Sequence, residues 1–210
     1  MPIPDANRWR VRHRRRGERY RWLKAFRCSC ANPATNEFLR NCPLCEKGRR
    51  YVEQTLNSAV RALVHSTTEA MDDEEFGLLP VGETQISVMP DESFLQRMDK
   101  VILPDRWLPE RVVLNRGTGA SDELPKSPVV SIVDVTQDAT VYVAGVNYQR
   151  TGNTIQWLSG APASGSNYAV EFTYSPTYVF LGSSQQVPRP DKNGLLMPLR
   201  GVLTMRNLEN

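Results

Sequence analysis

All four cysteines of this chain lie in one short stretch, residues 28–45, which reads CSCANPATNEFLRNCPLC. Its spacing is Cys-x-Cys, eleven residues and then Cys-x-x-Cys, formed by Cys28, Cys30, Cys42 and Cys45. Two close pairs separated by a short loop can form two edges of a tetrahedral metal site. The pattern predicts one structural zinc ion held by four thiolates, which leave no open coordination position for catalysis.

Free thiols and disulfides are the other interpretations of this cluster. A disulfide between Cys28 and Cys30 would be strained, and free buried cysteines do not ordinarily crowd in this way. The basic N-terminus is not followed by the apolar segment of a secretory signal, so we expect synthesis in the cytoplasm, where thiols stay reduced. Neighbouring basic residues are expected to offset the negative charge of the metal-bound thiolates, namely Arg27, Arg40, Lys47 and Arg49.

Residues 1–27 carry the positive charge of the chain. They hold ten basic and two acidic residues, a net charge of +8, whereas the rest holds 16 basic and 21 acidic residues, a net charge of −5. Such a segment is expected to be an extended arm that becomes ordered on binding, because its arginines repel one another. The candidate partner-binding residues are Arg8, Trp9, Arg10, Arg12, Arg14, Arg15, Arg16, Arg19, Tyr20, Arg21 and Trp22.

Three interpretations of this basic arm remain open. Arginine interleaved with aromatic residues suits phosphate contacts and base stacking on a nucleic acid. The same composition suits binding to an acidic protein surface. A solvated tail is the third possibility. Because no base-reading helix is evident, contact with DNA would be non-specific and made through the phosphate backbone.

The remainder of the chain has the two-residue period of β-strands. In residues 168–174 the side chains of Tyr168, Val170, Phe172 and Tyr174 alternate with smaller or polar residues, which predicts a half-buried antiparallel strand. In residues 129–135 the alternation predicts Val129, Ser131, Val133 and Val135 on one face. Thr151-Gly152-Asn153 predicts a tight turn. Residues 51–66 fit a helix or a strand equally well.

We therefore predict a mainly β fold, an antiparallel β-sandwich or small barrel with an N-terminal zinc knuckle and an extended basic arm. The expected division is an arm in residues 1–27, a zinc knuckle in residues 28–50 and a β-domain in residues 51–210. No catalytic constellation is evident, since neither histidine has a carboxylate or cysteine partner nearby in the sequence, and we expect no enzymatic activity. No apolar run is long enough to suggest a membrane partner.

Several stretches resemble the neck proteins of tailed bacteriophages, the head-closure or head-to-tail connector family with an N-terminal cysteine knuckle. They are FRCSC with CPLCEKGRRYVEQ, and FGLLPVGETQISVMPD with MDKVILPDR. The stretch YVAGVNYQRTGNTIQWLSGAPASGSNYAVEFTYSPTYVF is similar to a β-module that recurs in several kinds of virion protein. The knuckle and DKVILPD are the more specific parts of the likeness. This chain departs from the family in its first cysteine pair, which is Cys-x-Cys where Cys-x-x-Cys is the more familiar spacing.

The resemblance implies a structural subunit of the virion, made in the host cytoplasm. Such a subunit would form a homo-oligomeric ring that joins the portal or adaptor protein of the head to the tail proteins and encloses the DNA channel. Two alternatives remain open from the sequence. One is another virion part, such as a baseplate or tail-completion protein, and the other is a zinc-containing nucleic-acid-binding protein.

Overall fold

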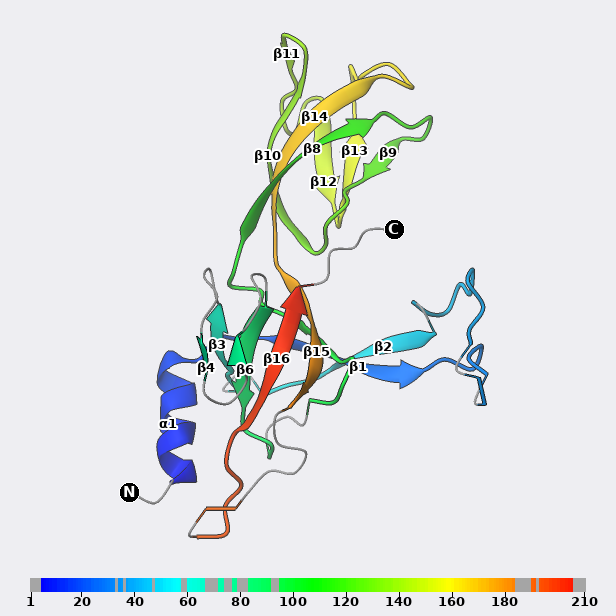
Figure 1. Ribbon diagram of the computed structural model, residues 1–210. Coiled ribbons are helices and arrows are strands. Elements are labelled where there is room, and N and C mark those ends of the chain that lie inside the picture. Colours follow the sequence, from blue (N-terminus) through cyan, green and yellow to red (C-terminus); the bar gives the residue numbers. More distant parts are fainter. Residues whose placement is uncertain are drawn as a thin grey trace. The chain divides into compact units, whose positions relative to one another are not determined.

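The computed structural model (Figure 1) describes residues 5–205 except 33, 36, 47, 58–59, 67–71, 74–76, 79–82, 92–94, 184–189 and 192. The chain divides into two compact units. Unit 1 comprises Met1–Leu103 and Tyr178–Arg206, and unit 2 comprises Pro104–Thr177 and Asn207–Asn210. In the described part of the chain, no helix is both long and apolar enough to cross a membrane.

Unit 1 is built on a seven-stranded sheet with the strand order β2-β1-β7-β15-β16-β6-β3. Its members are β1 (Arg21–Arg27), β2 (Arg49–Gln54), β3 (Leu63–Ser66), β6 (Glu83–Val88), β7 (Lys100–Ile102), β15 (Thr177–Ser183) and β16 (Leu199–Met205). A separate two-stranded ladder joins β4 (Asp72–Asp73) to β5 (Gly77–Leu78). Residues 51–66 thus contribute strands, and none of the described residues among them forms a helix.

Residues 5–27 of the basic arm form a helix and a strand of unit 1, so the prediction of an extended arm is wrong. Tyr20 and Trp22 are buried among side chains such as Val101 and Phe180. β1 pairs with β2 on one side and with β7 on the other, and the indole Nε1 of Trp22 donates a hydrogen bond to Asp99 at 2.8 Å. The net charge of the segment does not predict these contacts. Burial and strand pairing offset the repulsion among the arginines.

The first half of the basic segment forms the helix α1 (Ala6–Arg16), which lies beside β3 and β6 in Figure 1. Asp5 caps its N-terminus by accepting a hydrogen bond from the Asn7 N–H at 2.9 Å. His13 is buried, and its ring nitrogens bond the carbonyl oxygens of Trp9 and Ser87 at 2.8 and 2.9 Å. The bond to Trp9 lies within α1, whereas the bond to Ser87 on β6 holds the buried face of the helix against the sheet.

Unit 2 is a small β-sandwich. A four-stranded sheet with the order β11-β10-β14-β8 and a three-stranded sheet with the order β12-β13-β9 supply one shared core. The strands are β8 (Leu108–Asn115), β9 (Ser121–Glu123), β10 (Val129–Gln137), β11 (Thr140–Val141), β12 (Tyr148–Thr151), β13 (Thr154–Trp157) and β14 (Asn167–Tyr174). The prediction of a mainly β fold with antiparallel sheets is confirmed.

The predicted faces of two strands had different outcomes. On β14 the buried side chains are Tyr168, Val170, Phe172 and Tyr174, as the alternation predicts. On β10 Val129 and Val135 are buried, whereas Ser131 and Val133 are exposed. The pairing register of β10 with β14 shifts twice along the strand, and such bulges break the two-residue period of the side chains. The predicted face of β10 is therefore wrong.

The turn between β12 and β13 forms where it is predicted. Thr151 pairs with Thr154, and Gly152 has a positive φ of 60° at the first of the two central positions. This is the conformation in which a two-residue hairpin turn requires glycine.

The structure also differs from the predicted single β-domain in residues 51–210. Strands β2, β3, β6, β7, β15 and β16 belong to the sheet of unit 1 together with β1, and the intervening residues 104–177 form unit 2. The local sequence pattern does not show this division, because it depends on pairing between strands that are far apart in sequence, such as β1 and β7.

Candidate metal centre

The four cysteines lie in the loop that joins β1 to β2. The two strands pair antiparallel up to Arg27 and Arg49, and the loop of residues 28–48, here called the knuckle, begins directly after this last pair. The Cys28 N–H donates to the Gly48 carbonyl at 2.8 Å, which closes the base of the loop. The knuckle lies at the free end of the β1–β2 hairpin in Figure 1.

The sulfur atoms of Cys28, Cys30, Cys42 and Cys45 all lie within 4.8 Å of one another, and all four are free thiols. The Sγ atoms of Cys30 and Cys45 are 3.3 Å apart, and those of Cys28 and Cys42 are 4.0 Å apart. A tetrahedral zinc ion with zinc–sulfur bonds of about 2.3 Å places its ligands about 3.8 Å from one another. The cluster therefore has the ligand number and spacing to hold a metal ion.

Tight backbone turns bring the two cysteine pairs together. The Ala31 N–H donates to the Cys28 carbonyl at 3.0 Å after the first pair. Gly48 has a φ of 79°, and a Cβ atom there would lie 3.1 Å from the ring and Cβ of Phe38. The return of the chain to β2 thus requires glycine at this position.

The thiols differ in acidity because their surroundings differ. A hydrogen bond from the Cys30 backbone favours the thiolate of Cys28 and, against the opposing effect of burial, lowers its pKa to about 7. Burial raises the pKa of Cys45 to about 12 and also raises that of Cys30. Cys28 is therefore the first thiolate to form, and metal binding must displace protons from the more basic thiols.

The knuckle is tied to the sheet by charged side chains at its base. The Nζ atom of Lys100, on β7, lies 2.5 Å from the Glu46 carboxylate and 4.0 Å from the centre of the Tyr51 ring. Arg27 donates to the Asn32 carbonyl within the loop. Lys47, expected to help offset the thiolate charge, lies outside the described residues. Two leucines of the knuckle are exposed, Leu39 at 66% and Leu44 at 60%.

The structure divides the candidate partner-binding residues into two groups. Tyr20 and Trp22 are core residues, Arg21 binds Glu53 with two hydrogen bonds of 2.6 and 2.7 Å, and Arg10 pairs with Asp91. The exposed side chains are all arginines, namely Arg8, Arg12, Arg14, Arg15, Arg16, Arg19 and the paired Arg21. Trp9 is half-buried, with the guanidinium groups of Arg12 and Arg200 each 5.2 Å from its ring.

A buried polar network in unit 2 was not predicted from the sequence. Asp122 accepts hydrogen bonds from Trp157 Nε1 at 2.9 Å, from the Tyr168 hydroxyl at 2.8 Å and from the Gly117 N–H at 3.0 Å. Arg116 pairs with the same carboxylate at 3.2 Å. Burial raises the pKa of Asp122, but these hydrogen bonds and the nearby guanidinium outweigh it and hold the pKa below its ordinary value. Asp122, Trp157 and Tyr168 come from three different strands, β9, β13 and β14, and so are brought together by the fold.

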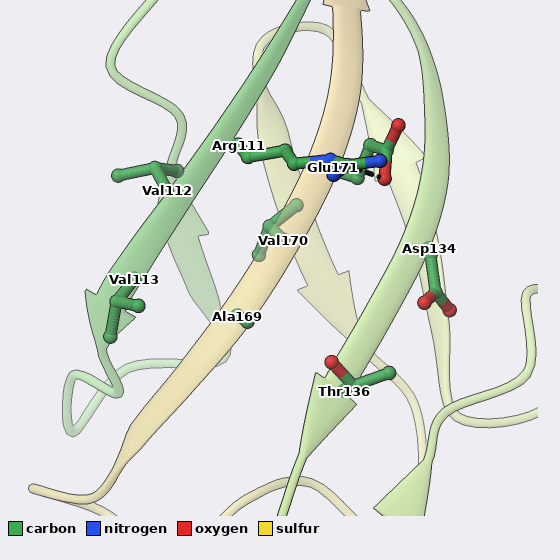
Figure 2. Close-up of a pocket in the computed structure, with 8 residues that line it drawn as sticks. All are labelled: Arg111, Val112, Val113, Asp134, Thr136, Ala169, Val170 and Glu171. Carbon is green, nitrogen blue, oxygen red and sulfur yellow. Dashed lines mark hydrogen bonds and ion pairs between the residues drawn. The ribbon is translucent and has the colours of Figure 1, made fainter.

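A shallow hollow of about 270 Å³ lies on the four-stranded sheet of unit 2. Figure 2 shows Arg111 reaching from β8 to Glu171 on β14, with Asp134 and Thr136 projecting from β10. The Arg111 Nε atom and the Glu171 carboxylate are 2.9 Å apart, and the remaining lining is aliphatic. These side chains form a sheet surface with one ion pair rather than a nucleophile beside a base.

The fold and the cysteine cluster define a mainly antiparallel β-protein with a four-cysteine knuckle. Residues 70–187 match the model of a family described as Domain of unknown function (DUF4815). The match covers more than half of the chain, and the chain belongs to this family. No curated protein matches the chain. The matched residues include nearly all of unit 2 but leave out the knuckle and α1.

Proposed function

We propose that the protein is a structural subunit of a tailed-phage virion, placed in the neck as part of a ring that joins head and tail. The observation that carries this proposal is the number of large apolar side chains left exposed on both units. On unit 2, Trp107, Val113 and Val141 are 63–65% exposed, and on the knuckle Leu39 and Leu44 are similarly exposed. In this proposal the neighbouring subunits cover these side chains, since contiguous exposed apolar surface marks interaction sites.

The strand edges add support for assembly. β2 and β3 lie at the two ends of the seven-stranded order, and β8 and β11 lie at the ends of the four-stranded order. Edge strands present backbone groups that neighbouring subunits can pair with. A closed ring needs two different surfaces on each subunit, and these edges supply candidates for both. In this proposal the protein acts by assembly and has no catalytic step.

The metal in this proposal is zinc, one ion per chain, with Cys28, Cys30, Cys42 and Cys45 as ligands. Four thiolates favour zinc among the common divalent ions, and the closed ligand set suits a structural site. The ion would order the knuckle so that Leu39 and Leu44 are presented in a fixed arrangement. Its role would be to shape a docking surface rather than to bind substrate.

Antibody labelling of virions of the encoding phage, viewed by electron microscopy, tests the location. Label at the head–tail junction is expected. Label at the distal end of the tail would support the baseplate alternative, and virions without label would reject a structural role. Native mass spectrometry of the purified protein then tests ring formation, for which a multiple of the 23.8 kDa subunit mass is expected. A monomer at every concentration, with and without added portal protein, would contradict the ring.

A further inference from the structure

We propose that the outward face of α1 is a binding site for the phosphate backbone of DNA. Within the helix, Ala6 and His13 face the sheet and are buried. Successive residues of an α-helix are about 100° apart around its axis, so Arg8, Arg12 and Arg15 share the opposite face. All three are exposed. We call these three residues the arginine face.

The helix that carries the arginine face is anchored to the rest of unit 1. Besides the bond between His13 and Ser87 on β6, the Ala6 N–H donates to the Asp191 carboxylate at 3.1 Å. At the other end of the helix, a Cβ on Gly17 would lie 2.3 Å from the His13 carbonyl and 2.6 Å from the Arg61 Cβ, so the chain passes too closely for a side chain. The backbone positions of the three arginines are therefore set by a helix that is held at both ends.

In the part of the chain that the structure describes, no carboxylate pairs with the three arginines of this face. Among the described residues, neither Arg8 nor Arg15 has an ion-pair partner, and Arg12 contacts only the Trp9 ring. The helix contains six arginines and no acidic residue. Like charges four residues apart, as in Arg8 and Arg12, destabilise a helix by about 0.2–0.5 kcal/mol per pair. A partner that carries regular negative charge would remove this repulsion.

The choice of DNA over an acidic protein follows from where the aromatic residues lie. Protein interfaces are anchored by buried aromatic and arginine side chains at their centre. Tyr20 and Trp22 lie in the core of unit 1, and Trp9 is half-buried. Val11 is therefore the one exposed apolar residue of α1. A surface of guanidinium groups with little apolar area suits a uniformly charged polymer instead.

The dimensions of the arginine face agree with such a polymer. Arg8 and Arg15 are seven residues apart, which is about 10.5 Å along the helix axis. A stretch of B-DNA of that length carries about six phosphate charges. Three arginines can therefore contact phosphates at the same time, with Arg14 and Arg16 exposed at the sides of the face. Such contacts read no base sequence.

The test is fluorescence anisotropy of a labelled mixed-sequence DNA duplex titrated with the full-length protein over a range of salt concentrations. The test variant is Arg8→Gln/Arg15→Gln. The control, Arg50→Gln/Arg97→Gln, removes the same charge from two other exposed arginines of unit 1. We expect the test variant to lower the salt slope of log affinity by about 2 and the affinity by at least about tenfold at 100 mM salt.

The control variant is expected to keep the slope of the unmodified protein, and Arg8→Lys/Arg15→Lys is expected to restore most of the binding. Circular dichroism would establish that every variant is folded. Absence of binding at low salt, or equal losses in the test and control variants, would overturn the proposal. So would tighter binding of poly-glutamate than of DNA at equal charge, since that result assigns the face to acidic proteins. Neither result bears on where the protein lies in the virion.

Discussion

The knuckle and the turn at residues 116–122 are both loops held by polar groups, but they are held in different ways. The turn carries its own counter-charge, because Arg116 and Asp122 pair with each other and are each 8% exposed. Arg116 also donates to the carbonyls of Gly117 and Gly119, both at 2.7 Å. The knuckle instead gathers four cysteine thiols that could hold a metal ion, and no buried ion pair is present among its described residues. Its order is therefore expected to depend on an ion, whereas that of the turn does not.

This difference has a structural cause. The turn lies on the core of unit 2, where Trp157 and Tyr168 supply both apolar cover and hydrogen bonds. The knuckle extends beyond the last pair of the β1–β2 hairpin, and Cys28 is its one buried hydrophobic residue among those described. A loop with little core of its own can be ordered by metal binding instead.

The largest effect is expected for Cys42→Ser. Removal of one of four thiolates should abolish tight metal binding, whose free energy is on the order of 10 kcal/mol in small zinc sites. Elemental analysis should find about one equivalent of zinc in the unmodified protein and almost none in the variant. Hydrogen exchange should increase in residues 28–48 and stay unchanged in unit 2. Ser29→Ala, between the first two cysteines, is the matched control, and equal metal loss there would contradict the assigned ligands.

A smaller effect is expected for Asp122→Ala. The change leaves the Arg116 guanidinium buried without its carboxylate, which ordinarily costs about 3–5 kcal/mol. Chemical denaturation of unit 2, followed by tryptophan fluorescence, measures this loss. The adjacent exposed Glu123→Ala provides the control and should change stability by less than about 0.5 kcal/mol. Addition of a metal chelator should leave the stability of unit 2 unchanged. Loss of stability of unit 2 with the chelator would contradict the expectation that the turn holds its order without an ion.

The pH dependence should also separate the two loops. The pKa of Cys28 is about 7, so below that pH a metal ion must displace one more proton. The slope of log metal affinity against pH should therefore be larger by about one below pH 7 than above it. This extra slope corresponds to about 1.4 kcal/mol of binding free energy per pH unit. Asp122 has a lowered pKa, so its contribution to stability is lost only in acid, below its ordinary range. Competition with a chelator between about pH 6 and 8 measures the slope, which would be uniform if Cys28 is not a ligand.

The smallest effect is expected for Arg111→Gln on the outer face of unit 2. Its ion pair with Glu171 resembles that of Arg116 with Asp122 in chemistry, but the Arg111 side chain is 78% exposed. Exposed pairs contribute about 0.2–1 kcal/mol. The same denaturation assay should therefore show a loss several times smaller than for Asp122→Ala. Equal losses in the two variants would mean that burial does not set the strength of these pairs.

The parts of the protein that could be predicted are those whose interactions are local in sequence. Four cysteines within 18 residues can meet through a few turns, so their clustering follows from spacing alone. The face of β14 was predictable because both neighbouring strands keep a regular register along it. The face of β10 was not, because its two register shifts depend on pairing with a strand more than thirty residues away.

By itself, the sequence determined the mainly β fold, the cysteine cluster and the Gly152 turn, because periodicity, close spacing and the φ of glycine act over a few residues. Only the tertiary structure decided the fate of the basic segment. Its charge predicts an extended arm, yet Trp22 finds a buried partner in Asp99 and His13 one in Ser87. These partners lie more than seventy residues away, and burial and hydrogen bonding there outweigh local repulsion among the arginines.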